Sequence, residues 1–159
     1  MRIRLFNRSD LAAVLAIQRR SPEAARWIEH DYERLAQDPG GQILVEELET
    51  TDPPKILGFT ALYCVIDQAE IRNMAVDPEH RRRGVGRALV EDARARLLRA
   101  GAKRIFLEVR ASNRAALALY YSVGFALHSR RKVYYREPPE DAYVLCLELR
   151  PPTVTSTTP

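Results

Sequence analysis

The stretch Met74–Gly86, MAVDPEHRRRGVG, contains the residues whose types and spacing point most clearly to chemistry. It reads as the end of an apolar strand, a turn at Asp77-Pro78, and a run of arginines that opens a helix. Gly84 and Gly86 let a backbone approach a ligand without a Cβ in the way. A helix that starts there directs its free N–H groups and positive dipole end outward, which is a geometry that binds phosphate. The same residues also allow an alternative without a phosphate ligand, in which a basic helix simply begins after a surface turn.

The string RRRGVG fits the pattern Arg/Gln-x-x-Gly-x-Gly/Ala, and in that form it resembles the pyrophosphate-binding loop of the GCN5-related N-acetyltransferases, the GNAT family. It lacks the third glycine of the dinucleotide fingerprint and the Gly-Lys-Ser/Thr of the P-loop. Three further segments, Leu107–Asn113, Ala116–Phe125 and Arg130–Tyr135, resemble the RimI-type enzymes, which acetylate the N-terminal alanine of a small-subunit ribosomal protein. The resemblance runs over about residues 70–149 and is weaker before residue 58.

This resemblance implies acetyl-CoA as the co-substrate. Backbone amides at the helix start would bind the pyrophosphate, supplemented by arginines, although any one of these arginines could equally be a solvated surface charge. The pantetheine arm would lie along a strand edge, where a backbone N–H near residues 74–76 serves as the oxyanion donor. The implied cofactor-binding residues are Met74, Ala75, Val76, Arg82, Arg83, Gly84, Val85, Gly86, Arg87 and Asn113.

Two further residues could move protons. Glu108 stands in the apolar context LEV, where its carboxylate could take the proton of an amine; composition alone also allows a half-buried glutamate paired with Arg110 or Arg104. The phenol of Tyr120 stays protonated at pH 7 and could protonate a departing thiolate, although it could also be a core aromatic. By resemblance, Glu108 falls on the proton acceptor and Tyr120 on the proton donor of the RimI-type pattern, whereas the adjacent Tyr121 is predicted to pack.

The acceptor is less well specified. An α-amine with a pKa of about 8 is roughly a tenth neutral at pH 7, whereas a lysine amine is neutral to only a few parts in ten thousand, so a modest base suits an N-terminus. We therefore expect acetylation of a protein N-terminus, with a ribosomal protein as the partner that the resemblance implies. The segment RRSPEAARWIEHDYERL lacks the Phe-Pro pair frequent in RimI-type proteins. A small-molecule amine or lysine acceptor, and a non-catalytic CoA- or RNA-binding module, are the alternatives.

The pattern along the chain predicts an α/β fold with the element order βααβββαβαββ, which agrees with the GNAT fold. Two parallel strands are expected on either side of the helix that carries Val85, Leu89, Ala93 and Leu97 at four-residue spacing. In the family these strands splay apart and hold the pantetheine arm. The predicted helices are a first one capped by Ser9-Asp10, a second over Ser21–Leu35, the Val85 helix, and one capped by Asn113. The predicted strands are a short one around Ile3 and Leu5, then Ile43–Leu48, Lys55–Ile66, Ala69–Val76, Arg104–Val109, Phe125–Tyr135 and Ala142–Leu149.

Composition favours a single domain over residues 1–150, because 159 residues with 46% apolar and 29% charged residues suit one core. The polar, Pro/Thr-rich residues 151–159 are predicted to form a disordered tail. The net charge of +4 is weak support for nucleic acid, since the arginines cluster where CoA binding needs them. His30, His80 and His128 share no metal-ligand spacing, so no metal is predicted.

Cys64 and Cys146 lie in apolar runs without metal or redox spacing, and we expect buried, reduced thiols. Reduced thiols favour the cytosol. Neither a signal-peptide core nor a run of about 20 apolar residues is present, so secretion and membrane insertion are not expected. Serine-hydrolase chemistry finds no support, because neither Ser112 nor Ser122 has a histidine or aspartate partner in a motif.

Overall fold

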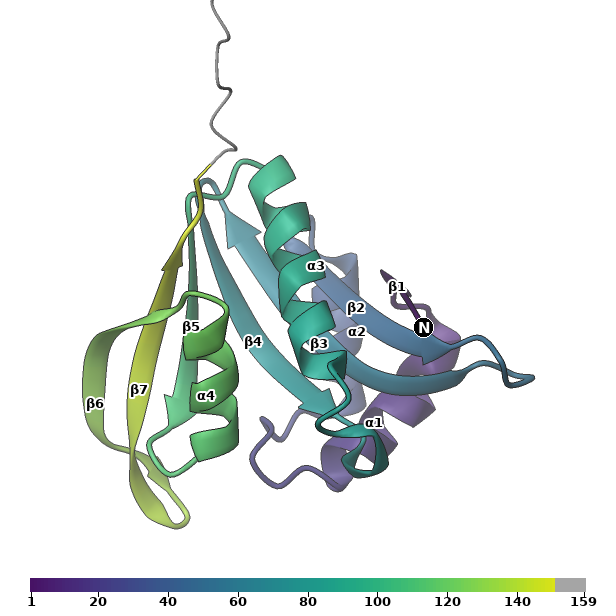
Figure 1. The fold of residues 1–159 in the computed structure, drawn as a ribbon, viewed down its shortest axis with the longest axis horizontal. Coiled ribbons are helices and arrows are strands. Elements are labelled where there is room, and N and C mark those ends of the chain that lie inside the picture. The colour runs from purple at the N-terminus through teal and green to yellow at the C-terminus, as the bar shows by residue number, and fades with distance from the viewer. Residues whose placement is uncertain (151–159) are drawn as a thin grey trace, which may run out of the picture.

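A computed structural model describes residues 1–150, and the predicted tail at 151–159 lies outside the described residues. Seven strands form one mixed sheet in the order β1-β2-β3-β4-β5-β7-β6 (Figure 1). The strands are β1 (Arg2–Leu5), β2 (Gly41–Leu48), β3 (Lys55–Val65), β4 (Gln68–Val76), β5 (Arg104–Arg110), β6 (Ala126–Arg136) and β7 (Pro139–Glu148). The helices are α1 (Leu11–Arg19), α2 (Glu29–Gln37), α3 (Val85–Arg99) and α4 (Arg114–Ser122). Apart from two short 3-10 turns, this is the predicted element order.

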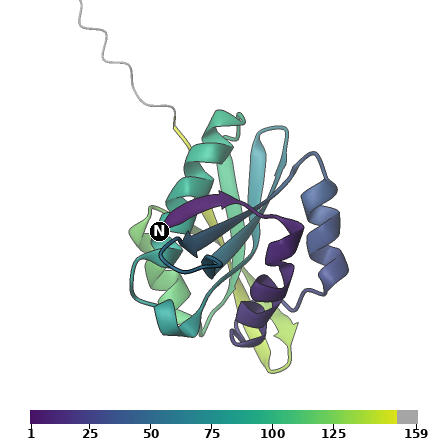
Figure 2. The ribbon, with the colours of Figure 1, turned by 90° about the vertical axis from the view of Figure 1, so that its right-hand side faces the viewer.

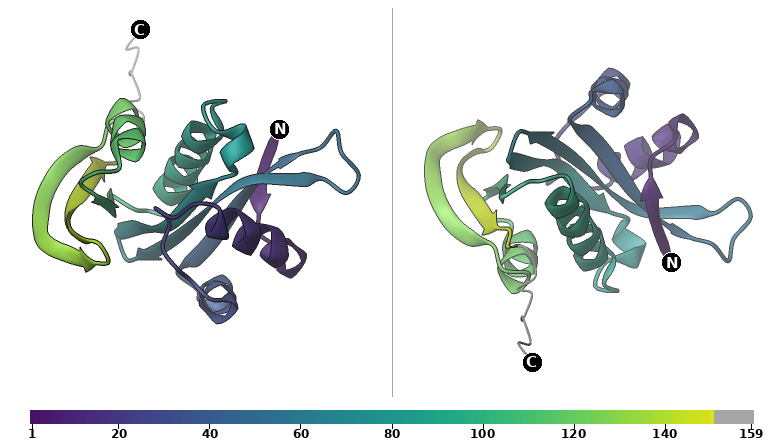
Figure 3. Two further views of the ribbon diagram at one scale, coloured as in Figure 1. Left: turned by 90° about the horizontal axis from the view of Figure 1, so that it is seen from below. Right: turned by 90° about the horizontal axis from the view of Figure 1, so that it is seen from above.

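The helices cover both faces of the sheet (Figures 2 and 3). Helices α1 and α2 pack on one face of β2 and β3, where Phe59 and Tyr32 are fully buried. Helix α3 lies on the other face, with α4 beside it over β5 and β7. The apolar stripe predicted for α3 is confirmed, because Val85, Leu89, Ala93 and Leu97 are all buried against the sheet.

Strands β4 and β5 form the predicted parallel pair, but they pair over only part of their length. Residues 68–71 of β4 pair with residues 104–107 of β5. Beyond these residues the two strands diverge, which Figure 1 shows toward the carboxyl ends of both arrows. The predicted splay is therefore present, and it leaves the last residues of β4 without a strand on that side.

The second predicted helix is wrong at its start. Helix α2 begins at Glu29, and residues 21–28 have no regular helix, so Ser21 is not a helix cap. Tertiary hydrogen bonds explain the difference: Asn73 on β4 bonds the N–H and the C=O of Ala25, and Gln18 bonds the carbonyl of Trp27. These contacts replace the helical hydrogen bonds that the segment's own propensity favours.

The first predicted cap also acts differently from expectation. Residues Arg8–Asp10 form a 3-10 turn, η1, ahead of α1. The Asp10 carboxylate accepts the N–H of Asn7 at 2.7 Å and pairs with Arg4 at 2.7 Å, and it makes no capping bond to α1. It therefore joins the first strand to the turn.

The hairpin of β6 and β7 ends the described chain at the far edge of the sheet. Nearly every residue of β6 is exposed, and the hairpin curves around the end of the sheet (Figure 3). Both cysteines are free thiols, but each is only half-buried and not buried as predicted: Cys64 lies near the end of β3, and Cys146 alternates with the buried Leu145 and Leu147 on β7. None of the described helices is long and apolar enough to cross a membrane.

Candidate active site

A cleft of about 1460 Å³ opens where β4 and β5 splay. It reaches both faces of the sheet: residues of α3 and α4 line one part, and residues 22–26 and the β6–β7 hairpin line another. Of the residues predicted from the sequence, those that line the cleft are Met74, Ala75, Val76, Arg82, Gly84, Gly86, Arg87, Glu108, Asn113 and Tyr120. Arg83 and Val85 do not line it, and the Val85 side chain belongs to the core.

The edge of β4 presents unpaired backbone groups to this cleft. In an antiparallel pair, alternate residues direct their N–H and C=O groups toward the partner strand and away from it. The N–H of Asp77 donates to the carbonyl of Leu57 on β3 at 2.8 Å, so the backbone of Ala75 also faces β3. The N–H groups of Met74 and Val76 therefore point to the β5 side, where the strands have separated. Of the three residues predicted at this edge, Ala75 does not offer its N–H.

The loop before α3 has the conformation that its glycine requires. Gly84 is the N-cap of α3 with φ +84°, a left-handed conformation that other residues adopt at a cost. Apart from Gly84 itself and the two residues next to it, no atom of residues 1–150 lies within 4 Å of the position that a Cβ on Gly84 would take. The first N–H groups of α3 have no partner inside the helix. A pyrophosphate group fits this arrangement of open space and free donors.

Gly86 lines the cleft and also has a packing role that the sequence did not predict. A Cβ on Gly86 would lie 3.1 Å from the Leu119 side chain and 3.2 Å from that of Met74. This glycine therefore lets the first turn of α3 pack closely against α4 and β4. Arg87 adds to that contact, since its guanidinium donates to Ser122 on α4 at 2.9 Å.

The three arginines before Gly84 differ in their partners. Arg81 donates to the carbonyl of Val76 at 3.3 Å and to the Ser21 hydroxyl at 3.0 Å, so it spans from β4 to the loop after α1. The exposed side chains of Arg82 and Arg83 make no hydrogen bond or ion pair within residues 1–150. Arg82 has a positive φ of 61°.

Tyr120 lies on the α3 and α4 side of the cleft. Its side chain is only 7% exposed and packs edge-on against Phe125. The hydroxyl group contacts the Met74 sulfur at 3.6 Å, a weak acceptor. Burial raises the pKa of Tyr120 to about 12. The phenol is therefore protonated at physiological pH and next to the free edge of β4, whereas the neighbouring Tyr121 is exposed.

Glu108 lies on the opposite face. Its neighbours on β5, Leu107 and Val109, are buried with α3 and α4, so the alternation of the strand turns Glu108 the other way. Its carboxylate pairs with Arg131 on β6 at 3.3 Å, and it is also the main reason that the pKa of Tyr134 is raised. The alternative pairing with Arg110 or Arg104 is wrong, because Arg110 pairs with Glu140 and Arg104 with Glu148. Glu108 is more exposed than its apolar context suggested.

Asn113 caps α4 as predicted, since its side-chain oxygen accepts the N–H of Ala116 at 3.1 Å. Two of the acidic residues after α1 form close ion pairs with arginines. Glu23 pairs with Arg81 at 2.9 Å, and Glu33 pairs with Arg8 at 2.8 Å.

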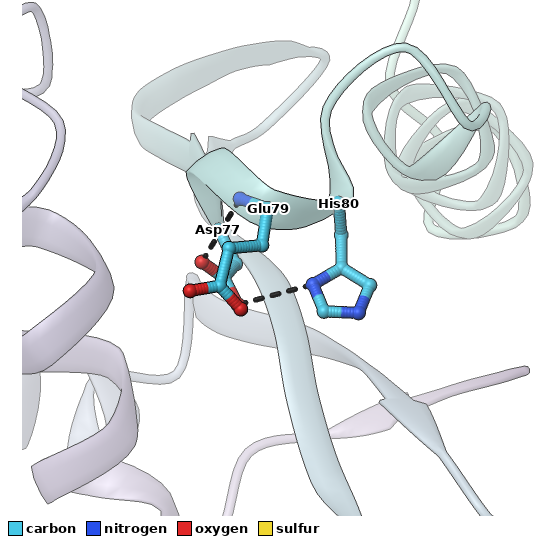
Figure 4. A group of neighbouring side chains, drawn as sticks. All are labelled: Asp77, Glu79 and His80. Atoms are coloured by element: carbon cyan, nitrogen blue, oxygen red, sulfur yellow. Dashed lines mark hydrogen bonds and ion pairs between the residues drawn. The ribbon is translucent and has the colours of Figure 1, made fainter.

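Asp77, Glu79 and His80 place three metal-ligating groups within 4.8 Å of one another (Figure 4). The Asp77 carboxylate already accepts the Glu79 N–H, faces His80 Nδ1 at 3.1 Å, and pairs with Arg20 and Lys55. Burial works to raise the pKa of Asp77, but the Glu79 N–H, His80 and Lys55 outweigh it and hold the pKa below its ordinary value. The cluster joins the turn after β4 to α1 and β3.

The model of the Acetyltransferase (GNAT) family matches residues 11–125. The chain belongs to the GNAT family. It is therefore an acetyltransferase, and the predicted family, fold class and enzyme class are confirmed. Enzymes of this family transfer the acetyl group of acetyl-CoA.

Several relatives share most of the chain. The ribosomal protein bS18-alanine N-acetyltransferase of Escherichia coli K12 is 37% identical over 89% of this chain and 93% of its own length. The corresponding enzyme of Salmonella typhimurium is 36% identical over 92% and 97%. Among solved structures, the S18-alanine N-acetyltransferase from Escherichia coli superposes with a TM-score of 0.81 at 32% identity, covering 97% of each chain. Naa20 of Chaetomium thermophilum, bound to a bisubstrate analogue, gives 0.80 at 27% identity over 94% and 87%.

Sequence reasoning missed several residues of the cleft. Arg131 and Tyr134 contact Glu108. Both lie in the segment Arg130–Tyr135, which carries part of the family resemblance, but its residue types do not indicate that it faces Glu108 on β5. Asn73 stands inside a strand without a motif of its own. A polar residue in an otherwise buried strand position was the available signal.

Proposed function

We propose that this GNAT acetyltransferase transfers an acetyl group from acetyl-CoA to the α-amine of a protein whose first residue is small, such as the N-terminal alanine of a ribosomal protein. The support comes from the relatives that carry this activity in their names, at 37% and 36% identity over most of both chains. The observation that carries the proposal is the placement of Glu108 and Tyr120 on opposite faces of the sheet, both lining one cleft at the splayed strands.

In this proposal the two faces have separate tasks. Acetyl-CoA supplies a thioester whose carbonyl carbon the amine attacks. The free N–H groups at the start of α3 bind the pyrophosphate, with Arg82 beside them, and the N–H groups of Met74 and Val76 bind the pantetheine arm and the thioester oxygen. Asn113 adds a polar contact from the start of α4.

Glu108 acts from the other face as the proton acceptor. Its carboxylate takes the proton that the amine loses as the new C–N bond forms, directly or through a water molecule. Tyr120 gives its proton to the thiolate that leaves as the C–S bond breaks. The raised pKa suits this role, because a phenol that keeps its proton at neutral pH is available as a donor whenever the thiolate departs.

The test compares two peptides at equal concentration. One begins with a free alanine, and the other has the same sequence with a blocked N-terminus and one lysine. We expect the initial rate with acetyl-CoA to be higher on the free α-amine, because its neutral fraction at pH 7 exceeds that of lysine by more than about a hundredfold. Mass spectrometry locates the acetyl group. Faster reaction of the blocked peptide would replace this proposal by lysine acetylation.

A further inference from the structure

Asn73 is the centre of a buried polar network that no motif of the sequence indicates. Its side chain is only 4% exposed. The side-chain oxygen accepts the N–H of Ala25 at 3.1 Å, and the amide nitrogen donates to the Tyr32 hydroxyl at 3.0 Å and to the Ala25 carbonyl at 3.3 Å. Gln18 accepts the Tyr32 hydroxyl proton and donates to the Trp27 carbonyl at 2.7 Å. Every polar atom of the Asn73 side chain thus has a partner.

This network holds residues 22–26 in a defined place. Their backbone follows no helix, and Ala25 gives both its N–H and its C=O to one side chain. An apolar residue in place of Asn73 would remove the acceptor of the Ala25 N–H and one of the two donors to the Ala25 carbonyl, which would keep only the Trp27 N–H at 3.1 Å. A fully satisfied buried network specifies one geometry far more sharply than apolar packing does.

The position of Asn73 in the strand gives the network its functional meaning. The next residue, Met74, directs its N–H into the gap between β4 and β5. Residues 22–26 line the part of the cleft opposite α3 and α4. Arg81 makes a second connection at the rim, through Ser21 and Glu23. One buried side chain thus fixes the distance between the strand edge and the loop that faces it.

We propose that Asn73 is a positioning residue that sets residues 22–26 as the wall of the acceptor side of the cleft. Its polar atoms are all bonded within the protein, so in this proposal it acts through the backbone of Ala25. This inference rests on the proposed function for the identity of the acceptor, and on the network alone for the placement of the loop. Because a misplaced wall weakens capture of the peptide more than it changes the reacting groups, its loss acts on the peptide KM.

The experiment measures three variants with the alanine peptide and acetyl-CoA. Asn73→Ala should raise the peptide KM at least about tenfold, change kcat less than about threefold, and leave acetyl-CoA affinity within about twofold. Tyr32→Phe, which removes one hydroxyl of the same network, should raise the peptide KM by a smaller factor. Thr60→Val is the matched control, because Thr60 is equally buried on β3 and its hydroxyl has no partner. It should change neither constant.

Hydrogen exchange at the Ala25 amide gives a readout independent of catalysis. Exchange should be at least about tenfold faster in Asn73→Ala than in the parent or in Thr60→Val. An unchanged peptide KM, or an equal loss of acetyl-CoA affinity, would overturn the positioning role. If Asn73→Ala does not fold, Tyr32→Phe decides by the same criteria. A parent enzyme inactive on every peptide would refute the proposed function instead, and exchange at Ala25 would still decide whether Asn73 places the loop.

Discussion

Replacing Tyr120 by phenylalanine separates proton donation from packing. The ring contact with Phe125, at 5.4 Å between centroids, is kept, and the lost hydroxyl had only the weak sulfur acceptor of Met74. The free energy of unfolding at pH 7 should therefore change by less than about 1 kcal/mol. The turnover number should fall by about 10²- to 10⁴-fold, the usual contribution of a general acid, with acetyl-CoA affinity little changed.

Single-turnover kinetics isolates the acetyl transfer step, and calorimetry measures acetyl-CoA affinity. With a pKa of about 12, only about 1% of Tyr120 is ionised at pH 10, so the parent should lose no activity through this group up to that pH. The deficit of Tyr120→Phe should thus be constant from about pH 7 to pH 10. Tyr121→Phe, on the exposed neighbour, is the control and should turn over like the parent.

The same substitution predicts a change in alkaline stability. The unfolded tyrosine has a pKa of about 10, and the folded pKa lies above it, so Tyr120 contributes stability below about pH 10 that is lost as the pH rises through about 12. At pH 11 the parent should have lost about 1 kcal/mol that Tyr120→Phe does not lose. Denaturant unfolding at pH 8 and pH 11 measures this difference. The buried Tyr32 is present in both proteins, so its own contribution to alkaline stability cancels in the comparison.

A phenylalanine variant with the parental single-turnover rate would refute Tyr120 as the proton donor.

Three other substitutions test separate parts of the structure. Glu108→Gln should lower the rate on an alanine peptide at least about tenfold at pH 7, with a smaller deficit above pH 8, where the α-amine is largely neutral by itself; a pH–rate series checks this. Gly86→Val should weaken acetyl-CoA binding more than about tenfold in calorimetry, because its side chain displaces Leu119 and α4; unchanged affinity would contradict the packing role. Glu46 is 4% exposed with one carboxylate oxygen unpartnered, and burial raises its pKa, so its charged form destabilises the fold at neutral pH. Glu46→Gln should therefore stabilise the protein by about 1 kcal/mol at pH 7 and by less near pH 4, where the parent carboxyl is protonated too; equal gains at both pH values would argue against this cause.

Much of the fold follows from local patterns. The four-residue spacing in α3, the glycine at position 84 and the asparagine at 113 each act within one or two turns of chain, and the structure places each of them as predicted. The sequence also predicts that the strands before and after α3 are parallel, because a helix that connects two strands of one sheet returns the chain in the same direction, by a right-handed crossover. The separation of these two strands toward their carboxyl ends was predicted from the resemblance to the GNAT family.

The boundary of α2 shows where local patterns fail. Ser21, Pro22 and Glu23 carry every local signal of a helix start, yet the chain there bonds Asn73 instead. That partner lies 48 residues away from Ala25 along the sequence. No window of neighbouring residues contains it, so propensity alone predicts a longer helix.

The sequence by itself determined the order of the elements and the glycine loop at the start of α3, because both depend on residue type and short spacing, and the family resemblance selected Glu108 and Tyr120 as candidate proton carriers. Only the tertiary structure decided that Glu108 faces Arg131, that Gly86 packs against Leu119, and that Met74 and not Ala75 offers its N–H to the cleft. Strand register and long-range hydrogen bonds make these choices, and a shift of one residue in register would turn each backbone group to the opposite side.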